Sequence, residues 1–146
     1  MSVSSKRLTG GCLCNAIRYE CTELPCDVHY CHCRLCQRAF GNVFAVFGCL
    51  PVSVLAFARG VPQLYRSTPY AERGFCGTCG TPLTFHYLRS EWIAIAIGSL
   101  DHPDVVRPEM HWGIESQVSW LALHDDLPRK PIEGEPEYMA WRRPYE

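Results

Sequence analysis

The sequence has no excess of charge of either sign. Its 14 Lys and Arg residues nearly balance 15 Asp and Glu residues, which leaves a formal net charge of −1. Proteins that attract nucleic acid or anionic membranes usually carry a basic excess. Neither nucleic acid nor a membrane surface is therefore expected as a partner.

Long apolar segments are also missing. No stretch approaches the roughly 18 consecutive apolar residues that a membrane-spanning helix needs. The first eleven residues contain Ser, Lys and Arg but no apolar run, so no signal peptide is predicted. These absences indicate a cytoplasmic protein, in which thiols would stay reduced.

No long segment has the 3.6-residue period of an amphipathic helix, and there is no repeat or linker. Short apolar or alternating runs bounded by Gly and Pro predict a mainly β chain instead. The expected strands lie in residues 17–21, 28–31, 43–50, 52–58, 63–67, 81–88, 92–97, 109–114 and 117–123. One helical turn is expected over residues 35–39, before Gly41.

With 146 residues, the chain fits a single domain with its own core. We assign residues 1–146 to one domain whose core runs from about residue 8 to 131. Several Pro and Gly residues follow Leu127, so residues 132–146 are expected to form an irregular tail on the surface.

What the sequence has in excess is cysteine, with ten residues in the chain. Such a number suggests a disulfide framework, metal ligands or redox-active thiols. A reducing compartment disfavours disulfides. Metal binding is therefore the leading interpretation even before the spacing is considered.

Two of the cysteine clusters complement each other. Cys12 and Cys14 are two residues apart, so on an extended chain both side chains face the same ion. Cys76 and Cys79 form a C-x-x-C turn in which Gly77 and Gly80 would permit positive φ. Together the pairs provide four thiolates, the usual set of a closed structural zinc site. Disulfides or redox pairs are the alternatives for these cysteines.

The third cluster has three cysteines, Cys31, Cys33 and Cys36, and no obvious fourth ligand. Three protein ligands and one open position are typical of catalytic zinc. Three thiolates on Zn²⁺ give a formal charge of +2 − 3 = −1, which suits a soft ligand such as a substrate thiol better than water. Closure by His32 or another side chain is an alternative. A thioredoxin-like motif is another, although no βαβ pattern surrounds the cluster.

Two arginines flank this anionic cluster. Arg34 and Arg38 either bind a substrate carboxylate or only offset the charge of the thiolates. Cys21, Cys26 and Cys49 stand alone and are expected to be core or loop thiols, because free Cys packs as a small apolar residue. The remaining histidines are expected to be packing or surface residues: His29, His86, His102, His111 and His124.

Three segments together resemble the glutathione-dependent formaldehyde-activating enzyme family, which includes centromere protein V. They are Gly10–Cys14, Tyr30–Cys36 and Arg73–Leu83, and further similarity lies in Ile97–Asp101, Met110–Trp112, Trp120 and Asp126–Pro128. The resemblance covers roughly residues 8–131. The order and spacing of these segments are far more specific than a single C-x-x-C motif.

The resemblance implies a β-tent fold of antiparallel sheets organised around zinc. It implies a structural zinc on Cys12, Cys14, Cys76 and Cys79, and an active-site zinc on Cys31, Cys33 and Cys36. The activity it implies is the joining of formaldehyde to glutathione as S-hydroxymethylglutathione, formally a carbon–sulfur lyase reaction.

From the residues and the resemblance together, we predict a carbon–sulfur lyase-like enzyme with two zinc ions per chain. Its substrate would be a small thiol, such as glutathione, or the aldehyde adduct of a thiol. A non-catalytic zinc module for protein interaction is the alternative, and metal storage or thiol sensing is a third interpretation. The sequence does not indicate an oligomeric state.

Overall fold

The structure is a computed structural model that describes residues 7–132. The described chain divides into two compact units that alternate along the sequence. The first unit contains residues 7–26 and 48–106, and the second contains residues 27–47 and 107–132. Each unit is described separately below.

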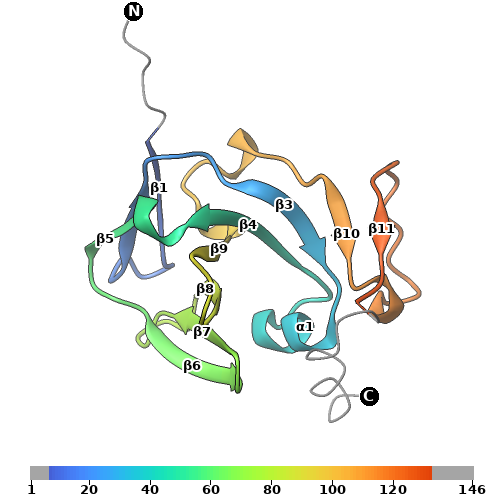
Figure 1. The fold of residues 1–146 in the computed structure, drawn as a ribbon, viewed down its shortest axis with the longest axis horizontal. Helices are drawn as coiled ribbons and strands as arrows, with labels where there is room; N and C mark the ends of the chain where they lie inside the picture. Colours follow the sequence, from blue (N-terminus) through green and yellow to red (C-terminus); the bar gives the residue numbers. More distant parts are fainter. Residues whose placement is uncertain (1–6, 133–146) are drawn as a thin grey trace, which may run out of the picture. The chain divides into compact units, whose positions relative to one another are not determined.

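The first unit consists of short strands and 3₁₀ turns (Figure 1). In chain order they are β1 (Leu8–Gly11), β2 (Arg18–Cys21), the end of β4 (Ala45–Pro51), η1 (Val52–Val54), β5 (Leu55–Arg59), β6 (Gln63–Thr68), β7 (Ala71–Phe75), β8 (Pro82–Tyr87), β9 (Trp92–Ala96), η2 (Ile97–Ser99) and η3 (Pro103–Val105). Strands β1, β2 and β5 form one antiparallel sheet in that order. Strands β6 to β9 form an antiparallel meander in chain order.

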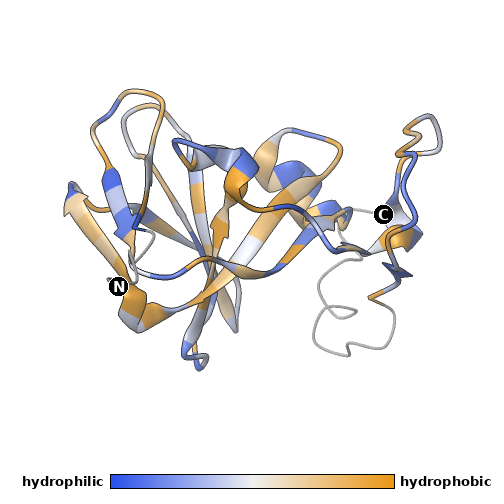
Figure 2. Ribbon diagram, turned by 90° about the horizontal axis from the view of Figure 1, so that it is seen from above, coloured by the Kyte–Doolittle hydropathy of each residue, from blue (hydrophilic) through white to orange (hydrophobic). Residues whose placement is uncertain are grey.

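The core of this unit lies where alternate strand residues point inward. Tyr19, Leu83 and Ile95 are at most 1% exposed. Figure 2 shows hydrophobic and hydrophilic residues in short alternating stretches along the strands, which is the pattern of a sheet with one buried face. In β1, a Cβ atom on Gly10 would lie 2.5 Å from the Tyr19 ring. Glycine therefore lets the neighbouring strand bring Tyr19 into the core.

The second unit contains the helix and a partly parallel arrangement of strands. Its elements are β3 (Cys26–Cys31), α1 (Arg34–Phe40), the start of β4, β10 (Met110–Trp112), η4 (Ile114–Ser116) and β11 (Arg129–Lys130). The strand order is β11-β10-β3-β4, and β10 runs parallel to both β3 and β11. Figure 1 shows α1 directly after β3, where the chain turns toward β4.

The mainly β class predicted from the sequence is confirmed, as are most of the expected strands. The helix at residues 34–40 is longer than the single turn expected, and it ends at Gly41 in the left-handed conformation, with φ of 59°. The expected strand at residues 52–58 divides into η1 and β5. The parallel pairing of β10 departs from the expected antiparallel sheets.

Other expectations were wrong. Residues 117–123 form turns and loops and no strand. Strands β1, β7 and β11 were not expected. Of the predicted tail, residues 133–146 lie outside the described part of the chain. The assignment of residues 1–146 to one zinc-binding domain stays a prediction.

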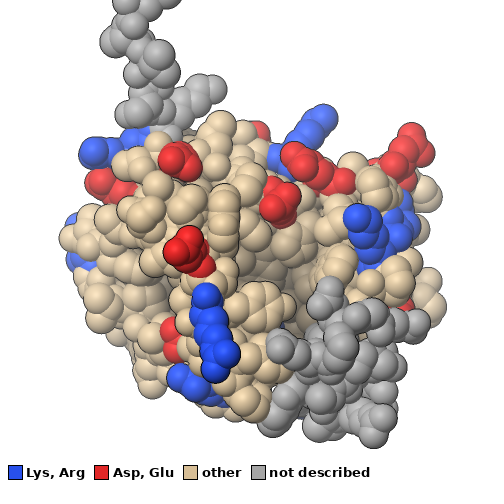
Figure 3. All heavy atoms as spheres, viewed as in Figure 1, with Lys and Arg blue, Asp and Glu red and all other residues tan. Residues whose placement is uncertain are grey.

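Helix length and surface charge bear on whether the protein could meet a membrane or a charged partner. No helix within residues 7–132 combines the length and apolar composition that a membrane crossing requires. On the face shown in Figure 3, acidic and basic side chains are interspersed, as the balanced composition predicts.

Candidate metal centres

Four cysteines of the first unit form one group. Cys12 and Cys14 follow β1, and Cys76 and Cys79 follow β7. Their four Sγ atoms lie within 4.8 Å of one another, and this group could hold a metal ion. The Sγ atoms of Cys12 and Cys14 are 3.6 Å apart, and those of Cys14 and Cys76 are 3.8 Å apart. These distances suit sulfurs that share an ion and are too long for a disulfide.

Backbone N–H groups point at the sulfurs of this group. Ile17 N donates to Cys12 Sγ at 3.2 Å, and Thr78 N and Cys79 N both lie 3.4 Å from Cys76 Sγ. Such bonds stabilise a thiolate, the form that binds metal. The C-x-x-C turn closes through a bond from Gly80 N to Cys76 O at 2.8 Å.

The predicted role of glycine in this turn is half correct. Gly80 has a φ of +81°, which a side chain would strain. Gly77 has no positive φ. A Cβ atom on Gly77 would lie 2.7 Å from the side-chain oxygen of Gln63, the end of a flexible side chain that can move aside, so only Gly80 has a clear need for glycine.

The thiols of this group affect one another's protonation. The pKa of Cys79 is lowered to about 5, chiefly because the Thr81 hydroxyl and the backbone stabilise its thiolate. The pKa of Cys14 is raised to about 11: a backbone bond near Ala16 lowers it, but burial and the neighbouring thiols outweigh that bond. Negative charge on one sulfur therefore opposes charge on the next. A bound cation removes this conflict because it stabilises all four thiolates.

The second group lies entirely within the second unit. The Sγ atoms of Cys31, Cys33 and Cys36 lie within 4.8 Å of one another, and the three residues are 4–5% exposed. Cys31 ends β3, and Cys33 is the N-cap of α1. Cys33 Sγ accepts a hydrogen bond from Cys36 N at 3.3 Å. The start of the helix thus sets the spacing of two of the three sulfurs.

Without a cation these three thiols cannot all ionise. The pKa of Cys31 is raised well above its ordinary value because Cys33 and Cys36 compete for the charge and burial adds to the effect. The pKa of Cys33 is raised to about 12: the bond with Cys31 lowers it, but Cys36 and burial prevail. A buried set of soft donors that repel one another's charge fits a soft metal cation, and these residues could hold one.

Among residues 7–132, no fourth Cys, His, Asp or Glu donor joins these three sulfurs. His32, the alternative fourth ligand, is fully buried, and its Nε2 atom lies 2.8 Å from Nδ1 of His111. Burial lowers the pKa of His32 to about 4, with a smaller contribution from His111. The neutral imidazole is therefore its resting form.

The two arginines flanking the cluster both lie on α1. Arg34 is half-buried and donates a hydrogen bond to the side-chain oxygen of Gln37. Arg38 is exposed in the last turn. A spacing of four residues puts both arginines on the same face of the helix. Their role toward a substrate stays a prediction.

Sequence reasoning missed three residues that connect to His32 beside this centre: Gln37 and His111, which are buried, and Asp125, which is partly exposed. Gln37 donates from Nε2 to the carbonyls of His32 and Ser116, at 2.8 and 3.0 Å. His111 is fully buried and joins His32 to Asp125. The available signal was His111 within an apolar strand-like run, since a buried imidazole requires polar partners.

All ten cysteines lie in the described part of the chain, and none forms a disulfide. Cys21 is fully buried, and burial raises its pKa to about 11, as for a thiol packed as an apolar residue. Cys26 is exposed and donates to the Cys49 carbonyl at 3.5 Å. Cys49 is half-buried, so of these three cysteines Cys21 alone is a core thiol.

The fold and the two cysteine groups define a mainly β protein with two candidate metal centres, one in each unit. The statistical model of the glutathione-dependent formaldehyde-activating enzyme family matches residues 7–116, well over half of the chain. The chain belongs to this family, as the resemblance of its motifs predicted.

Two individual proteins are also similar. An uncharacterized lyase of the yeast Schizosaccharomyces pombe is 35% identical over 78 residues, which are 53% of this chain and 56% of the yeast protein. The alignment thus spans little more than half of that relative. A crystal structure of a Rhodobacter sphaeroides protein matches with a TM-score of 0.54 at 24% identity, over 71% of this chain and 98% of that protein. This likeness supports the fold alone.

Proposed function

We propose that this chain is a zinc-dependent carbon–sulfur lyase-type enzyme that acts on a small thiol or its aldehyde adduct. The family and the lyase name of the yeast relative support the lyase class. The choice of zinc, of two ions per chain and of glutathione as the thiol belongs to the proposal. A cytoplasmic location, where thiols stay reduced, also belongs to the proposal.

One observation carries this proposal. Three buried sulfurs converge in the second unit, and among the described residues no fourth donor completes their set. The centre in the first unit, in contrast, has the four sulfurs of a closed tetrahedral site. We assign the first centre to structure and the second, on Cys31, Cys33 and Cys36, to substrate binding.

The reaction is an addition without oxidation or reduction. The thiol loses its proton, its sulfur forms a bond to the aldehyde carbon, and the C=O π electrons take up a proton to give a hydroxyl group. The reverse reaction breaks the same carbon–sulfur bond. Zinc, when bound, would supply stabilisation of a thiolate at neutral pH.

The residues of the chain have two roles in this scheme. The N–H of Cys36 stabilises negative charge on Cys33, which favours the thiolate set over neutral thiols. Arg38, exposed on α1, offers positive charge to a carboxylate-bearing thiol such as glutathione. Arg34 would contribute in the same way, and it also donates a hydrogen bond to the side-chain oxygen of Gln37.

The direct test is a panel of thiols measured by calorimetry on the zinc-loaded protein. Binding through sulfur should release a proton, so the measured heat should depend on the ionisation enthalpy of the buffer. Product formation from glutathione and formaldehyde should be followed by NMR of the new S–CH₂–OH group. The Cys36→Ser variant should lose both signals.

Two results would overturn the proposal. One is the absence of binding by any thiol to protein that holds two metal ions. The other is a cobalt spectrum indicating four protein ligands at the centre of Cys31, Cys33 and Cys36, because a closed site has no position for a substrate.

A second candidate function rests on the edge strand β6. Leu64 and Tyr65 are 57% and 64% exposed on this strand, and nearby Val61 is 77% exposed. Exposed apolar residues on a sheet edge are typical of protein-interaction surfaces. A binding module would use this edge and keep both metal centres structural. Loss of partner binding in Tyr65→Lys, with no thiol chemistry in the parent protein, would favour it.

A further inference from the structure

A continuous chain of side-chain hydrogen bonds runs beside the centre of Cys31, Cys33 and Cys36. Asp125 Oδ2 lies 3.0 Å from His111 Nε2, and His111 Nδ1 lies 2.8 Å from His32 Nε2. Both histidines are fully buried, while the Asp125 side chain is 27% exposed. All three residues belong to the second unit. The hydrogen bonds therefore connect the partly exposed carboxylate of Asp125 to His32, the residue between the candidate ligands Cys31 and Cys33.

The carboxylate of Asp125, at one end of this series of hydrogen bonds, determines where the protons of the two histidines lie. The hydrogen bond from His111 lowers the pKa of Asp125, so this residue is a carboxylate and can only accept. His111 must then donate from Nε2. No described residue could accept a hydrogen bond from an N–H at His32 Nδ1, so the proton between the two rings belongs to His32 and His111 Nδ1 accepts it. His32 therefore donates from Nε2, and its Nδ1 carries no proton.

The other tautomer of His32 is disfavoured for two reasons. It would place two lone pairs face to face between His32 Nε2 and His111 Nδ1. It would also bury an N–H at Nδ1, an atom for which the described residues provide no hydrogen-bond partner. The carboxylate of Asp125 thus selects the tautomer of His32 through His111.

The backbone of His32 is held on both sides. Its N–H donates to the Trp112 carbonyl at 2.8 Å, and its carbonyl accepts from Gln37 Nε2 at 2.8 Å. The side chain makes the third connection, to His111. Because His32 stands between Cys31 and Cys33, fixing its backbone and ring also fixes the direction in which the two neighbouring sulfurs leave the chain.

Ring packing supports the same orientation. The Tyr30 ring stacks on His111 with centroids 4.6 Å apart and an interplanar angle of 14°. The rings of His32 and His111 are near-parallel, at an interplanar angle of 21°, and meet edge to edge through their hydrogen bond, with centroids 5.1 Å apart. Phe44 packs edge-on against Tyr30 at 5.3 Å. These contacts limit ring rotation, so the hydrogen bonds need only choose between tautomers.

We propose that Asp125 and His111 are positioning residues for the centre formed by Cys31, Cys33 and Cys36. They fix the tautomer and ring orientation of His32 and so hold two sulfurs in the arrangement that accepts a metal ion. The inference rests on the proposed function only in taking this centre as a metal site. Partners of this kind usually change metal affinity by about 10–100-fold.

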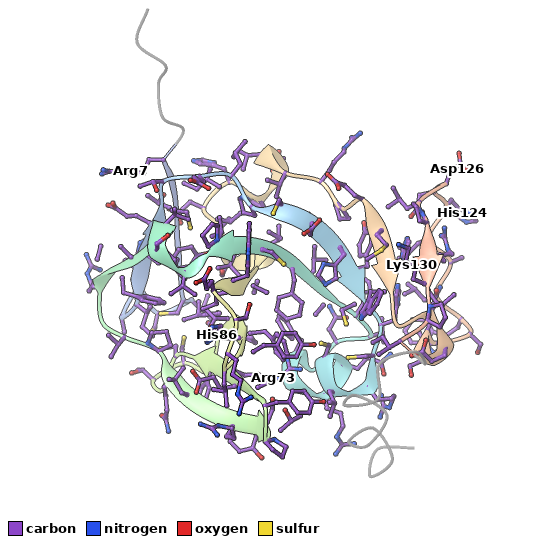
Figure 4. All side chains as sticks on the ribbon, viewed as in Figure 1. Arg7, Arg73, His86, His124, Asp126 and Lys130 are labelled. Atoms are coloured by element: carbon purple, nitrogen blue, oxygen red, sulfur yellow. The ribbon has the colours of Figure 1, made fainter. Side chains whose placement is uncertain are left out.

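The test compares Asp125→Ala and His111→Phe with the matched control Asp126→Ala. Asp126 is exposed, and its side chain points away from the ribbon in Figure 4. Nitrogen NMR of the imidazoles reports the tautomer, and a chromogenic chelator reports the rate of metal release. Two kinetic phases of metal release are expected, one for each centre. The phase that is missing in Cys36→Ser belongs to the centre of Cys31, Cys33 and Cys36.

We expect His32 to lose its single tautomer in both test variants, and metal release from this centre to accelerate about tenfold. Asp125→Asn keeps an acceptor oxygen toward His111 and should restore most of the slow release. Unchanged tautomers and release rates in both Asp125→Ala and His111→Phe, equal to those of Asp126→Ala, would overturn the inference. No thiol enters these measurements, so their outcome is separate from that of the proposed enzyme activity.

Discussion

The hydroxyl oxygen of Thr81 lies 3.1 Å from Cys79 Sγ, and the same hydroxyl accepts a hydrogen bond from Leu13 N at 3.0 Å. Leu13 stands between Cys12 and Cys14, so a single side chain connects the two halves of the four-cysteine centre. A hydroxyl can accept from the N–H and donate to the thiolate at the same time. Thr81 therefore both stabilises charge on Cys79 and aligns the two ligand pairs.

Replacing Thr81 by Val should weaken metal binding at the four-cysteine centre about tenfold, because the substitution removes both bonds and keeps the volume. Thr81→Ser keeps the hydroxyl and should behave like the parent protein. Competition with a chelator measures the affinity. If Val and Ser at this position gave equal affinities, the hydroxyl would have no role in the centre.

The two centres should differ in what their loss does to the fold. Cys79→Ser removes a ligand that links the turn after β7 to the loop after β1, so metal and folding energy are lost together. We expect a loss of several kcal/mol, on the order of 10 °C in melting temperature. Cys36→Ser should melt close to the parent protein with one metal ion fewer.

Calorimetric melting and elemental analysis of the two variants decide this point. Isolated parent protein should contain two metal ions per chain. Equal melting temperatures for Cys79→Ser and Cys36→Ser would contradict the assignment of one structural and one substrate-binding centre.

Asp101 should contribute stability that disappears in acid. Its pKa is lowered to about 2, chiefly by hydrogen bonds from Arg18 and Thr9. The unfolded value is near 4, so the stabilisation is complete above about pH 4 and is lost as the pH falls toward 2. In acid the cysteine ligands of both metal centres also become protonated and release the metal. The measurement must separate this effect from the protonation of Asp101.

The comparison of Asp101→Asn with the parent protein makes that separation. At neutral pH the variant should be less stable, and the difference in unfolding free energy should shrink to zero between about pH 4 and pH 2. Urea unfolding at a series of pH values measures it. Asp104→Asn, at an exposed position, serves as the control. A difference that stays constant down to pH 2 would rule out the ion pair with Arg18 as the cause.

Gln37 should contribute more to the free energy of unfolding than Gln117 does. Its amide donates to the carbonyls of His32 and Ser116, and Gln37→Leu would leave both without this donor. The expected loss is about 1–3 kcal/mol in denaturant unfolding. Gln117→Leu is the matched control, because among the described residues the Gln117 amide donates within its own loop, to Leu121 O at 3.2 Å. Equal losses in both variants would argue against a special role for Gln37.

Local spacing was a sufficient guide within each cysteine cluster, because residues two or three positions apart must lie close together whatever the rest of the fold does. The joining of the Cys12–Cys14 pair to the Cys76–Cys79 pair, in which Cys14 and Cys76 are 62 positions apart, was inferred from the four ligands that a closed zinc site needs. The connection of His32 to His111 and Asp125 joins residues 79 and 14 positions apart. Pairs this distant depend on strand pairing, in this case of β3 with β10, which one sequence does not reveal.

The strand errors have a similar origin. Strand β7 reads Ala-Glu-Arg-Gly-Phe and has no apolar alternation, but it pairs on both sides with β6 and β8. Residues 117–123 have a strand-like composition, yet Trp120 is 72% exposed and the segment forms turns. Composition describes how well a residue suits a sheet, whereas partners decide whether a strand forms.

The last prediction concerns the charge that a thiol substrate meets. Arg38 is exposed in the last turn of α1, the helix that begins at Cys33, so its guanidinium can attract the carboxylates of glutathione. Arg38→Gln should weaken glutathione binding on the order of threefold, as expected for one solvent-exposed charge. Mercaptoethanol has no carboxylate, and its affinity should not change.

The controls for this prediction separate local from general effects of charge. Arg89→Gln removes the same charge at an exposed position in the turn between β8 and β9 and should leave both thiols unaffected. Arg34→Gln should weaken both thiols together, because the Arg34 guanidinium supports Gln37 and through it the backbone of His32. Screening by salt should reduce the effect of Arg38 and not that of Arg34. If Arg38→Gln weakened both thiols equally, Arg38 would support the centre and would not recognise the carboxylate.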